Sequence, residues 1–270
     1  MISKSAFSAF SICLALSFIF ALSALVPSPL QAGSASSEMI VDAMVEAHGG
    51  MTAWAEAPTV SWQDAFLPPG APAPITAQIT VEQGLRRAYA DFPGTEMSFA
   101  WDGEKAWSQN WGLPFPPRFM ALLNYHFLNL PWLAKDPGVH LGAPGVGKLK
   151  GDPTEYITVK ITYGDGVGDT PKDYYILYIH PKTHQLKACS YIVTYRAILP
   201  EGMETSPQNT LIYDDFADVG GLLVPTQYTI YQADHSVYAS ATIQDWSFEK
   251  TFDEARMEMA EGAVVDTSQP

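Results

Sequence analysis

The stretch NYHFLNLPWLAKDPGVHLG, from Asn124 to Gly142, separates two parts of the sequence that both show strand patterns. It is rich in large apolar and aromatic side chains, and a single Lys–Asp pair carries its formal charges. Two prolines interrupt it, so it is too short and irregular to span a membrane or to form one regular strand. We therefore interpret it as an apolar insertion between two halves of one sheet.

The insertion begins upstream of Asn124, in a segment that is predicted to be helical. Pro116 and Pro117 can open a helix from about Arg118, because proline fits the first helical turn. Helical spacing then places apolar and aromatic side chains on one side: Phe119, Leu122, Leu123, His126 and Phe127. Pro131 is predicted to end this helix. The insertion could then lie across the concave face of a curved sheet.

The segments on either side of the insertion have a period of two, which is typical of β-strands. In residues 59–66 the side chains of Val60, Trp62, Asp64 and Phe66 share one face. Turn signals separate the other runs, among them Asp102-Gly103 and Gly220-Gly221. Because no alternation of strand and helix occurs, the sheet should be antiparallel. The sequence predicts roughly ten strands, a short closing helix at 252–259 and a frayed polar tail.

A short amphipathic helix is predicted at the start of the folded chain, in SSEMIVDAMVEAHGG, residues 36–50. Ser36 or Ser37 can cap its beginning, and Gly49 can adopt the left-handed conformation that ends a helix. His48 lies at the carboxyl end, where its ring could bind the last helical carbonyls. We interpret His48 as a capping residue and not as a catalytic one.

Residues 1–32 have the features of a signal peptide. An early cation, Lys4, precedes a long apolar run, and small residues follow that suit cleavage after Ala32. An uncleaved N-terminal anchor is the alternative. We expect a periplasmic or secreted protein with no stable membrane span after signal removal, in which residues 33–270 form a single domain.

The composition excludes some functions. The formal net charge is −14 at neutral pH and no basic cluster is present, so binding to nucleic acid or to anionic lipid surfaces is not expected. After signal removal, Cys189 is the only cysteine, so no intramolecular disulfide can form. Stability must then come from a hydrophobic core, which an aromatic content of 12% can supply.

No pattern of catalytic or metal-binding residues stands out. Cys189 lies in a strand-like stretch with no neighbouring base, which favours a structural role. His180 and His184 have metal-ligand spacing only on a helix, and Pro181 lies between them. The acidic stretch at 164–173 lacks the ligand spacing of an EF-hand. The sequence therefore predicts no catalytic residue, no metal site and no cofactor.

Aromatic residues provide the strongest functional signal. Of the seven tryptophans, all but Trp246 lie at or before Trp132. A sheet that curves around a cavity can line it with aromatic side chains and cover it with an apolar segment. The alternative is that these side chains simply form the core. On the cavity interpretation, the candidate ligand-binding residues are Trp62, Phe99, Trp101, Trp107, Phe119, Leu123, Phe127, Leu130 and Trp132.

Four stretches in order resemble an exported bacterial family of uncharacterised function: VEAHGGMTAWAEAPTVSW, NLPWLAKDPGVHL, GDTPKDYYILYIHPKTHQLKACSYIVTY and YDDFADVGGLLVPTQYTIY. That family is similar to the LolA/LolB lipoprotein-carrier fold. The resemblance implies a mainly β (α+β) protein with a large curved antiparallel sheet. This sheet forms a half-open barrel, and helices cover its concave face. In the carriers of that fold the cavity holds lipid acyl chains. Arg86, Arg87 and Arg118 are available to fasten the insertion over the sheet.

Our leading hypothesis is an exported protein that binds or carries a lipid or another apolar ligand. A second hypothesis is a structural module with a filled interior, whose apolar insertion binds another envelope protein. A third is an enzyme that acts on an apolar substrate. The size of a cavity beneath residues 112–142 would discriminate among the three.

Overall fold

A computed structural model of the protein describes residues 35–270. The predicted signal peptide, residues 1–32, lies outside the described residues. The helices of the described part are α1 (Ser37–Ala47), α2 (Gly50–Glu56), α3 (Pro117–Leu133) and the short 3-10 helices η1 (Arg196–Ile198) and η2 (Glu254–Met257).

Strands account for most of the regular structure between residues 35 and 270. The first half of the chain contributes β1 (Thr59–Leu67), β2 (Ile75–Glu82), β3 (Ala88–Asp91), β4 (Ser98–Trp101) and β5 (Ala106–Gln109). The second half contributes β6 (Val139–Leu141), β7 (Gly145–Gly147), β8 (Tyr156–Tyr163), β9 (Tyr175–Ile179), β10 (Leu186–Tyr191), β11 (Asn209–Val219), β12 (Leu222–Tyr231), β13 (Val237–Ser247) and β14 (Val264–Val265).

All of these strands belong to one antiparallel sheet, in the order β14-β5-β4-β3-β2-β1-β13-β12-β11-β10-β9-β8-β6, with β7 also paired to β8. The strand β13 joins the two halves, because it pairs with β1 on one side and with β12 on the other. The end strands β14 and β6 have no common partner, so the sheet is not closed. The predicted mainly β, antiparallel architecture is confirmed.

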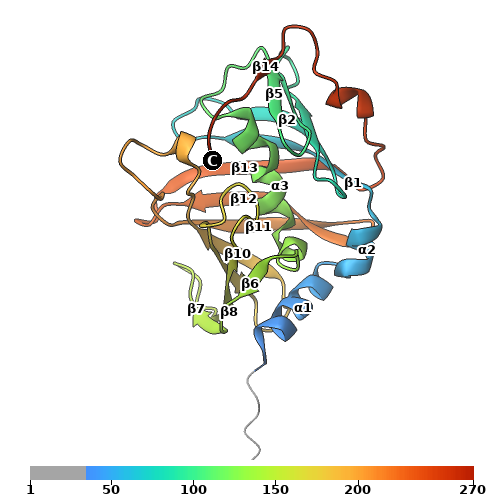
Figure 1. Cartoon of the computed structure of the whole chain (residues 1–270). Helices are drawn as coiled ribbons and strands as arrows, with labels where there is room; N and C mark the ends of the chain where they lie inside the picture. The colour runs from blue at the N-terminus through green and yellow to red at the C-terminus, as the bar shows by residue number, and fades with distance from the viewer. Residues whose placement is uncertain (1–34) are drawn as a thin grey trace, which may run out of the picture. The chain divides into compact units, whose positions relative to one another are not determined.

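The helix α3 shows that the sheet is curved. It contacts β3, β4 and β5 in one half of the sheet and β12 in the other. The ring of Phe127 on α3 also packs on Tyr175 of β9 and Tyr191 of β10. A flat sheet of this size would be about 60 Å wide, whereas a helix is only about 10 Å across. The sheet must therefore wrap around α3, which crosses in front of the strands (Figure 1). This confirms the predicted half-open, helix-covered arrangement.

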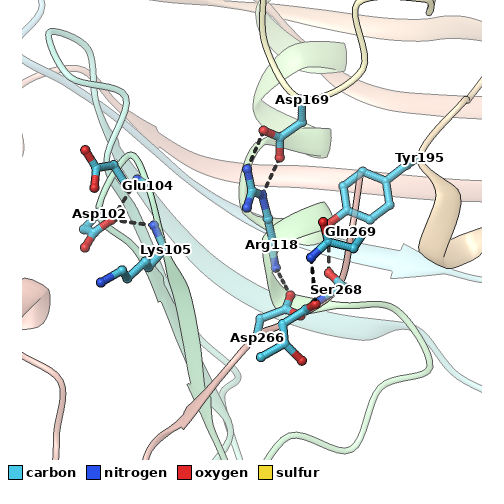
Figure 2. Close-up of polar contacts among 10 residues, drawn as sticks. Asp102, Glu104, Lys105, Arg118, Asp169, Tyr195, Asp266, Ser268 and Gln269 are labelled. Carbon is cyan, nitrogen blue, oxygen red and sulfur yellow. Dashed lines mark hydrogen bonds and ion pairs between the residues drawn. The ribbon is translucent and has the colours of Figure 1, made fainter.

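Both turn signals of the sequence form hairpins. Val219 pairs with Leu222, so Gly220 and Gly221 make a two-residue turn in which φ is +63° and +87°. Positive φ at both positions is the requirement of a type I′ turn, which glycine meets without strain. Between β4 and β5 the turn takes four residues, and the Asp102 side chain accepts hydrogen bonds from the Glu104 and Lys105 backbones (Figure 2).

The helix α1 ends against the sheet, and His48 makes this junction. The ring Nδ1 of His48 donates to the carbonyl of Leu223 at 2.8 Å, and Nε2 accepts from the backbone N–H of Leu186 at 3.0 Å. The predicted capping of helical carbonyls by this ring is therefore wrong: the ring binds two strands. Gly49 is required beside it, because a Cβ there would lie 2.2 Å from the carbonyl oxygen of Gly221.

His48 should make the stability of the fold depend on pH. Burial lowers the pKa of His48 from 6.5 to about 4, so between these values the unfolded chain binds more protons than the folded chain. The stabilisation by neutral His48 is complete above pH 6.5 and is lost as the pH falls toward 4. The difference in unfolding free energy between wild type and His48→Ala should shrink by about 3 kcal/mol over this range.

Urea unfolding at a series of pH values would measure this difference. At neutral pH, His48→Ala should cost about 2–4 kcal/mol, because it leaves a buried N–H and a buried carbonyl without partners. His140→Ala is the matched control, since His140 is exposed on β6. Equal pH dependence in the wild type and the His48 variant would contradict the assignment.

The helix α3 does not end at Pro131, as the sequence predicts, but continues to Leu133. Proline lacks the N–H that would bind the carbonyl of the residue four positions earlier, which here is Phe127. The hydroxyl of Tyr213 on β11 donates to that same carbonyl. Tyr213 is 2% exposed, so no bulk water competes for the bond. A strand side chain thus replaces the missing helical hydrogen bond and lets the helix pass through the proline.

Tyr213 and Pro131 should therefore be energetically coupled. Tyr213→Phe should cost about 1–3 kcal/mol, because the Phe127 carbonyl would be left buried without a donor. Adding Pro131→Ala should recover much of this loss, since alanine at that position restores an N–H for the same carbonyl. A double-mutant cycle measured by urea unfolding tests the coupling.

The control for this cycle is Tyr231→Phe at the end of β12, where the tyrosine is partly exposed. It should change stability little, with or without Pro131→Ala. Additive effects of Tyr213→Phe and Pro131→Ala would show that the two residues act independently and that the strand hydroxyl does not replace the helical hydrogen bond.

The carboxyl-terminal segment is not frayed. Val264 and Val265 pair with Ser108 and Trp107 of the edge strand β5, and the closing helix is the single turn η2. The backbone N–H of Asp266 then donates to the carbonyl of Ala106. The edge strand supplied hydrogen-bond partners that the local sequence could not reveal.

Candidate functional site

Two clefts lie beside the amino-terminal half of α3. The first, of about 680 Å³, is called the apolar cleft below, and the second has about 660 Å³. Phe119 and Leu123 of α3 and Val193, which follows β10, line both clefts. These three side chains therefore form the wall between them. Both volumes fall in the range of small-molecule binding sites.

The apolar cleft has walls from four parts of the chain. α3 contributes Phe119, Met120, Leu123 and Phe127, while the sheet contributes side chains of β1, β10, β12 and β13. The segment between β10 and β11 forms the third wall, and the β12–β13 turn forms the fourth. Asp234, in that turn, is the one formally charged side chain of the lining, and it is exposed. The cleft is thus a largely apolar space with water at its mouth.

The wall between β10 and β11 is an irregular segment, residues 192–208, with η1 in its first half. Its apolar side chains that line the cleft include Ile198, Leu199 and Met203. Asp173 fastens the beginning of this segment, because its carboxylate accepts from the backbone N–H and the hydroxyl of Thr194 at 2.6 and 2.7 Å. Hydrogen bonds between Val193 and Ser206 close the segment into a loop.

The amino-terminal end of α3 is held by Arg118, at the edge of the second cleft (Figure 2). Its guanidinium binds both carboxylate oxygens of Asp169 at 2.6 and 2.8 Å and lies over the ring of Trp101. Its backbone N–H donates to Asp266 of the carboxyl-terminal segment at 2.8 Å. A bidentate arginine–carboxylate pair fixes geometry better than a single contact. The beginning of α3 is therefore anchored on two segments.

The carboxyl-terminal segment also binds the loop that walls the apolar cleft. Tyr195 shares a hydrogen bond with Ser268 at 2.9 Å, and the N–H of Ala197 donates to the Gln269 carbonyl. Figure 2 shows Tyr195 and Ser268 beside the Arg118 group. Residues 266–269 thus connect the start of α3 to residues 192–208.

Of the other two candidate arginines, Arg86 also reaches the insertion. It pairs with Asp136, just after α3, at 2.7 Å and lies over the ring of Tyr125. Arg87 instead pairs with Glu82 and Glu254, away from α3. Arg118 and Arg86 therefore hold the two ends of the insertion, and Arg87 holds η2.

The second cleft has a more polar lining than the first. His126 and Tyr163 share a hydrogen bond of 3.0 Å there, and the Arg86–Asp136 pair borders it. Burial, together with the nearby Arg86, lowers the pKa of His126 to about 4. This histidine is therefore a neutral hydrogen-bonding group at neutral pH.

The inner side of the apolar cleft carries a buried polar group made of Asp64, Asn124 and Tyr228. Asp64 faces inward from β1, with 1% exposure, and its Oδ2 accepts a hydrogen bond from Asn124 of α3. Asn124 and Tyr228 line the cleft, whereas Asp64 lies behind its lining, hydrogen-bonded to Asn124. Burial raises the pKa of Asp64 from 3.8 to about 7, although the bond from Asn124 acts in the opposite direction.

The structure separates the predicted ligand-binding residues into groups. Phe119, Leu123 and Phe127 line the apolar cleft, and Trp101 joins Phe119 and Leu123 in the second cleft. Trp62, Leu130 and Trp132 are 0% exposed in the main core and line neither cleft.

Phe99 and Trp107 also lie outside the two clefts. They border a smaller, more polar hollow of about 380 Å³ beside η2. Phe99 packs on Phe92 and Trp111 in the main core, whereas Trp107 belongs to a separate cluster with Tyr89 and Ala100. Binding at any of these positions stays a prediction.

The sequence analysis missed the wall formed by residues 192–208. Its signal is the apolar content of RAILPEGM, residues 196–203, in a segment with the glycine and prolines of a turn. Apolar side chains in such a loop are expected to pack on another part of the protein, and here they line the apolar cleft. The polar group of Asp64 and Tyr228 was also missed, although alternation places Asp64 on the same face as Trp62 and Phe66.

The remaining titratable residues singled out in the sequence have structural positions. Cys189 is 0% exposed, and burial raises the pKa of its thiol to about 12, which keeps the reactive thiolate unpopulated. His180 accepts hydrogen bonds from the backbones of Lys182 and Thr183 within its turn. In the acidic stretch, Asp169 is paired with Arg118.

Comparison with known proteins shows similarity in structure alone. No protein-family model and no curated protein matches the sequence. A LolA superfamily protein from Nitrosomonas europaea superposes with a TM-score of 0.53 and 11% identity, over 82% of this chain and 97% of the other. The chain has a LolA-like fold. A DUF1329 family protein from Desulfovibrio piger superposes with a TM-score of 0.54 and 8% identity, over 83% and 98%.

The helices that the structure describes in the LolA-like chain are not of the membrane-spanning kind. Among residues 35–270, none of them combines the length and the apolar character needed to cross a bilayer.

Asp64 should give the LolA-like chain a pH dependence of opposite sign to that of His48. Its folded pKa of about 7 exceeds the ordinary 3.8, so the folded chain holds the proton more tightly between these values. The favourable contribution is complete below pH 3.8 and is lost as the pH rises toward 7. Asp64→Asn should therefore be more stable than wild type by up to about 4 kcal/mol above pH 7 and similar to it near pH 4.

Thermal or urea unfolding of wild type and Asp64→Asn at a series of pH values between about 4 and 7 measures this difference. Asp245→Asn is the control, since Asp245 is exposed on β13 and asparagine tolerates its positive φ. An advantage of Asp64→Asn that does not change with pH would refute the raised pKa.

Proposed function

We propose that this protein is an exported, envelope-associated binder or carrier of a lipid or another apolar ligand, which it holds in the apolar cleft. The observation that carries the proposal is the cleft itself: about 680 Å³, lined mostly by apolar side chains, between α3 and the inner face of the sheet. A site of this kind, with few polar groups, is suited to an acyl chain.

Burial of hydrocarbon supplies the binding energy. Each methylene group moved from water into an apolar site contributes about 0.8 kcal/mol, so a chain of moderate length binds without any ion pair. The charge distribution agrees with this, because the single charged lining residue, Asp234, lies at the exposed mouth. An acyl chain would enter with little electrostatic cost.

The two halves of α3 have different roles in this proposal. In the carboxyl-terminal half, Leu128, Leu130 and Trp132 are 0% exposed, and Trp132 stacks on Trp54 at 4.5 Å. That half seals the core permanently. In the amino-terminal half, Phe119 and Met120 are only partly buried and face the cleft. A ligand can therefore occupy the cleft while the core stays closed.

The fold and the sequence features support the same proposal from other directions. The LolA-like fold is shared over most of the chain with a LolA superfamily protein. The resemblance of the sequence to the lipoprotein-carrier fold implies a cavity for acyl chains, and the signal-peptide pattern of residues 1–32 implies export. We infer a binding role without catalysis, and two open clefts favour it over a module with a filled interior.

Native mass spectrometry of the purified protein, with fluorescence of N-phenyl-1-naphthylamine, tests the proposal. The wild type should retain lipid and should bind the probe. Met120→Trp should weaken probe binding at least about tenfold, because the larger ring would occupy the cleft. Met39→Trp is the matched control, since Met39 is 64% exposed on another helix. It should bind like wild type.

A second control separates the two clefts. Val167 lines only the second of them, so Val167→Trp should leave probe binding unchanged if the ligand occupies the apolar cleft. The absence of both co-purified lipid and probe binding would sink the proposal. Loss of binding in Val167→Trp, with normal binding in Met120→Trp, would move the site to the second cleft.

A further inference from the structure

The geometry points to the polar group of Asp64, Asn124 and Tyr228 as a recognition site for an uncharged hydroxyl head group, so that the ligand of the apolar cleft is an amphiphile whose hydroxyl is inserted inward. This inference rests on the proposed function, because it names the chemical class of ligand for the same cleft.

Asp64 is a carboxyl group in an unusual position. It points inward from β1, between Trp62, which is 0% exposed, and Phe66, which lines the cleft. Asn124 is the one hydrogen-bond partner of Asp64 among the described residues. The Oδ1 atom of Asp64 has no partner among those residues. Nearly all buried polar groups in proteins have a partner, so an unpaired carboxyl oxygen calls for a role.

Tyr228 supplies the second unpaired group. It is 0% exposed, and its hydroxyl has no hydrogen-bond partner in the described part of the chain. The residue nevertheless lines the cleft, from β12. In the register of the sheet, Tyr228 pairs with Ala241 of β13, which in turn pairs with Phe66 of β1. Because the Ala241 side chain between them is small, Tyr228 and Phe66 face the same space.

The electrostatics of this group favour an uncharged head. No arginine or lysine pairs with Asp64 in the described residues, and no nearby charge contributes to the shift of its pKa. The titratable group that faces it is Tyr228, whose own pKa is raised by burial and by Asp64, with Tyr191 of β10 beyond it. An anionic head would meet a carboxyl group and no cation, and an ammonium head would add the cost of burying a second ion.

A hydroxyl fits these partners. It can accept from the Tyr228 hydroxyl or from protonated Asp64, and it can donate to the free Asp64 oxygen. A ligand without a polar head would leave both groups unpaired, at a cost of about 1–3 kcal/mol for each. The cleft should therefore discriminate between amphiphiles that have the same chain and different heads.

Displacement of N-phenyl-1-naphthylamine by a matched ligand series tests this inference. Dodecanol should bind about tenfold more tightly than dodecyl methyl ether, which has the same chain but cannot donate. Dodecanoate and dodecylamine should also bind more weakly than dodecanol. Tyr228→Phe should weaken the binding of dodecanol and of the ether alike, because both oxygens can accept from the Tyr228 hydroxyl, while the preference for dodecanol, which alone donates to Asp64, should remain.

Two further variants keep the test interpretable. Tyr231→Phe, on the same strand but outside the cleft lining, should bind dodecanol and the ether as tightly as wild type. Asp64→Asn keeps a hydrogen-bonding side chain without a charge, so it should bind dodecanol and should tolerate dodecanoate better than wild type. Tyr228→Phe removes a buried hydroxyl that has no partner in the described part of the chain, so it should unfold at the same urea concentration as wild type or at a higher one.

The failures can be told apart. Equal binding of dodecanol and its methyl ether by wild type would overturn the head-group inference and leave the apolar-ligand function standing. Tighter binding of dodecylamine than of dodecanol would indicate an ion pair with Asp64 and would also overturn the head-group inference. If neither the probe nor any member of the series binds, the proposed function itself has failed.

Discussion

The hydrogen bond from Tyr213 to the carbonyl of Phe127 is the contact on which the interior arrangement depends. Pro131 leaves that carbonyl without a helical donor, and the strand hydroxyl takes the place of the missing N–H. The contact holds α3 inside the curve of the sheet as one continuous helix. Because α3 occupies the concave side, it determines both how much of the interior is filled and how much remains as a cleft.

The remaining contacts of α3 divide it into a fixed half and a half that borders the clefts. Trp132 stacks on Trp54 of α2, and Leu130 is 0% exposed, so the carboxyl-terminal half belongs to the core. The amino-terminal half is held at its edges by Arg118, with Asp169 and Asp266. Because these contacts hold α3 at its beginning and not along its length, the side chains of Phe119 and Leu123 stay available to line a ligand site.

Two buried titratable groups show how differently a fold can treat polar side chains. Both ring nitrogens of His48 have backbone partners, so this residue joins α1 to the sheet and gains from being neutral. Asp64 has one partner and one free oxygen in a similar environment. A satisfied buried group stabilises a structure, whereas an unsatisfied one costs stability unless it serves binding. The contrast is the reason for placing ligand recognition at Asp64.

The sequence by itself determined the type of sheet. Alternation in residues 59–66, the glycine pair at 220–221 and the four family-like stretches predict an antiparallel, helix-covered sheet. The same alternation places Asp64 on one face with Trp62 and Phe66. Such patterns depend on near neighbours, which the sequence displays directly. The sequence also identified the insertion that borders the clefts.

Only the tertiary structure decided which residues enclose a space. Tyr213 lies 86 positions from Phe127, and His48 lies 138 positions from Leu186, so neither bond has a local signal. The aromatic residues looked equivalent in the sequence, yet Trp62 and Trp132 fill the core while Phe119 and Phe127 line a cleft. Periodicity assigns a side chain to a face of the sheet, but whether that face is filled depends on elements that approach it from distant parts of the chain.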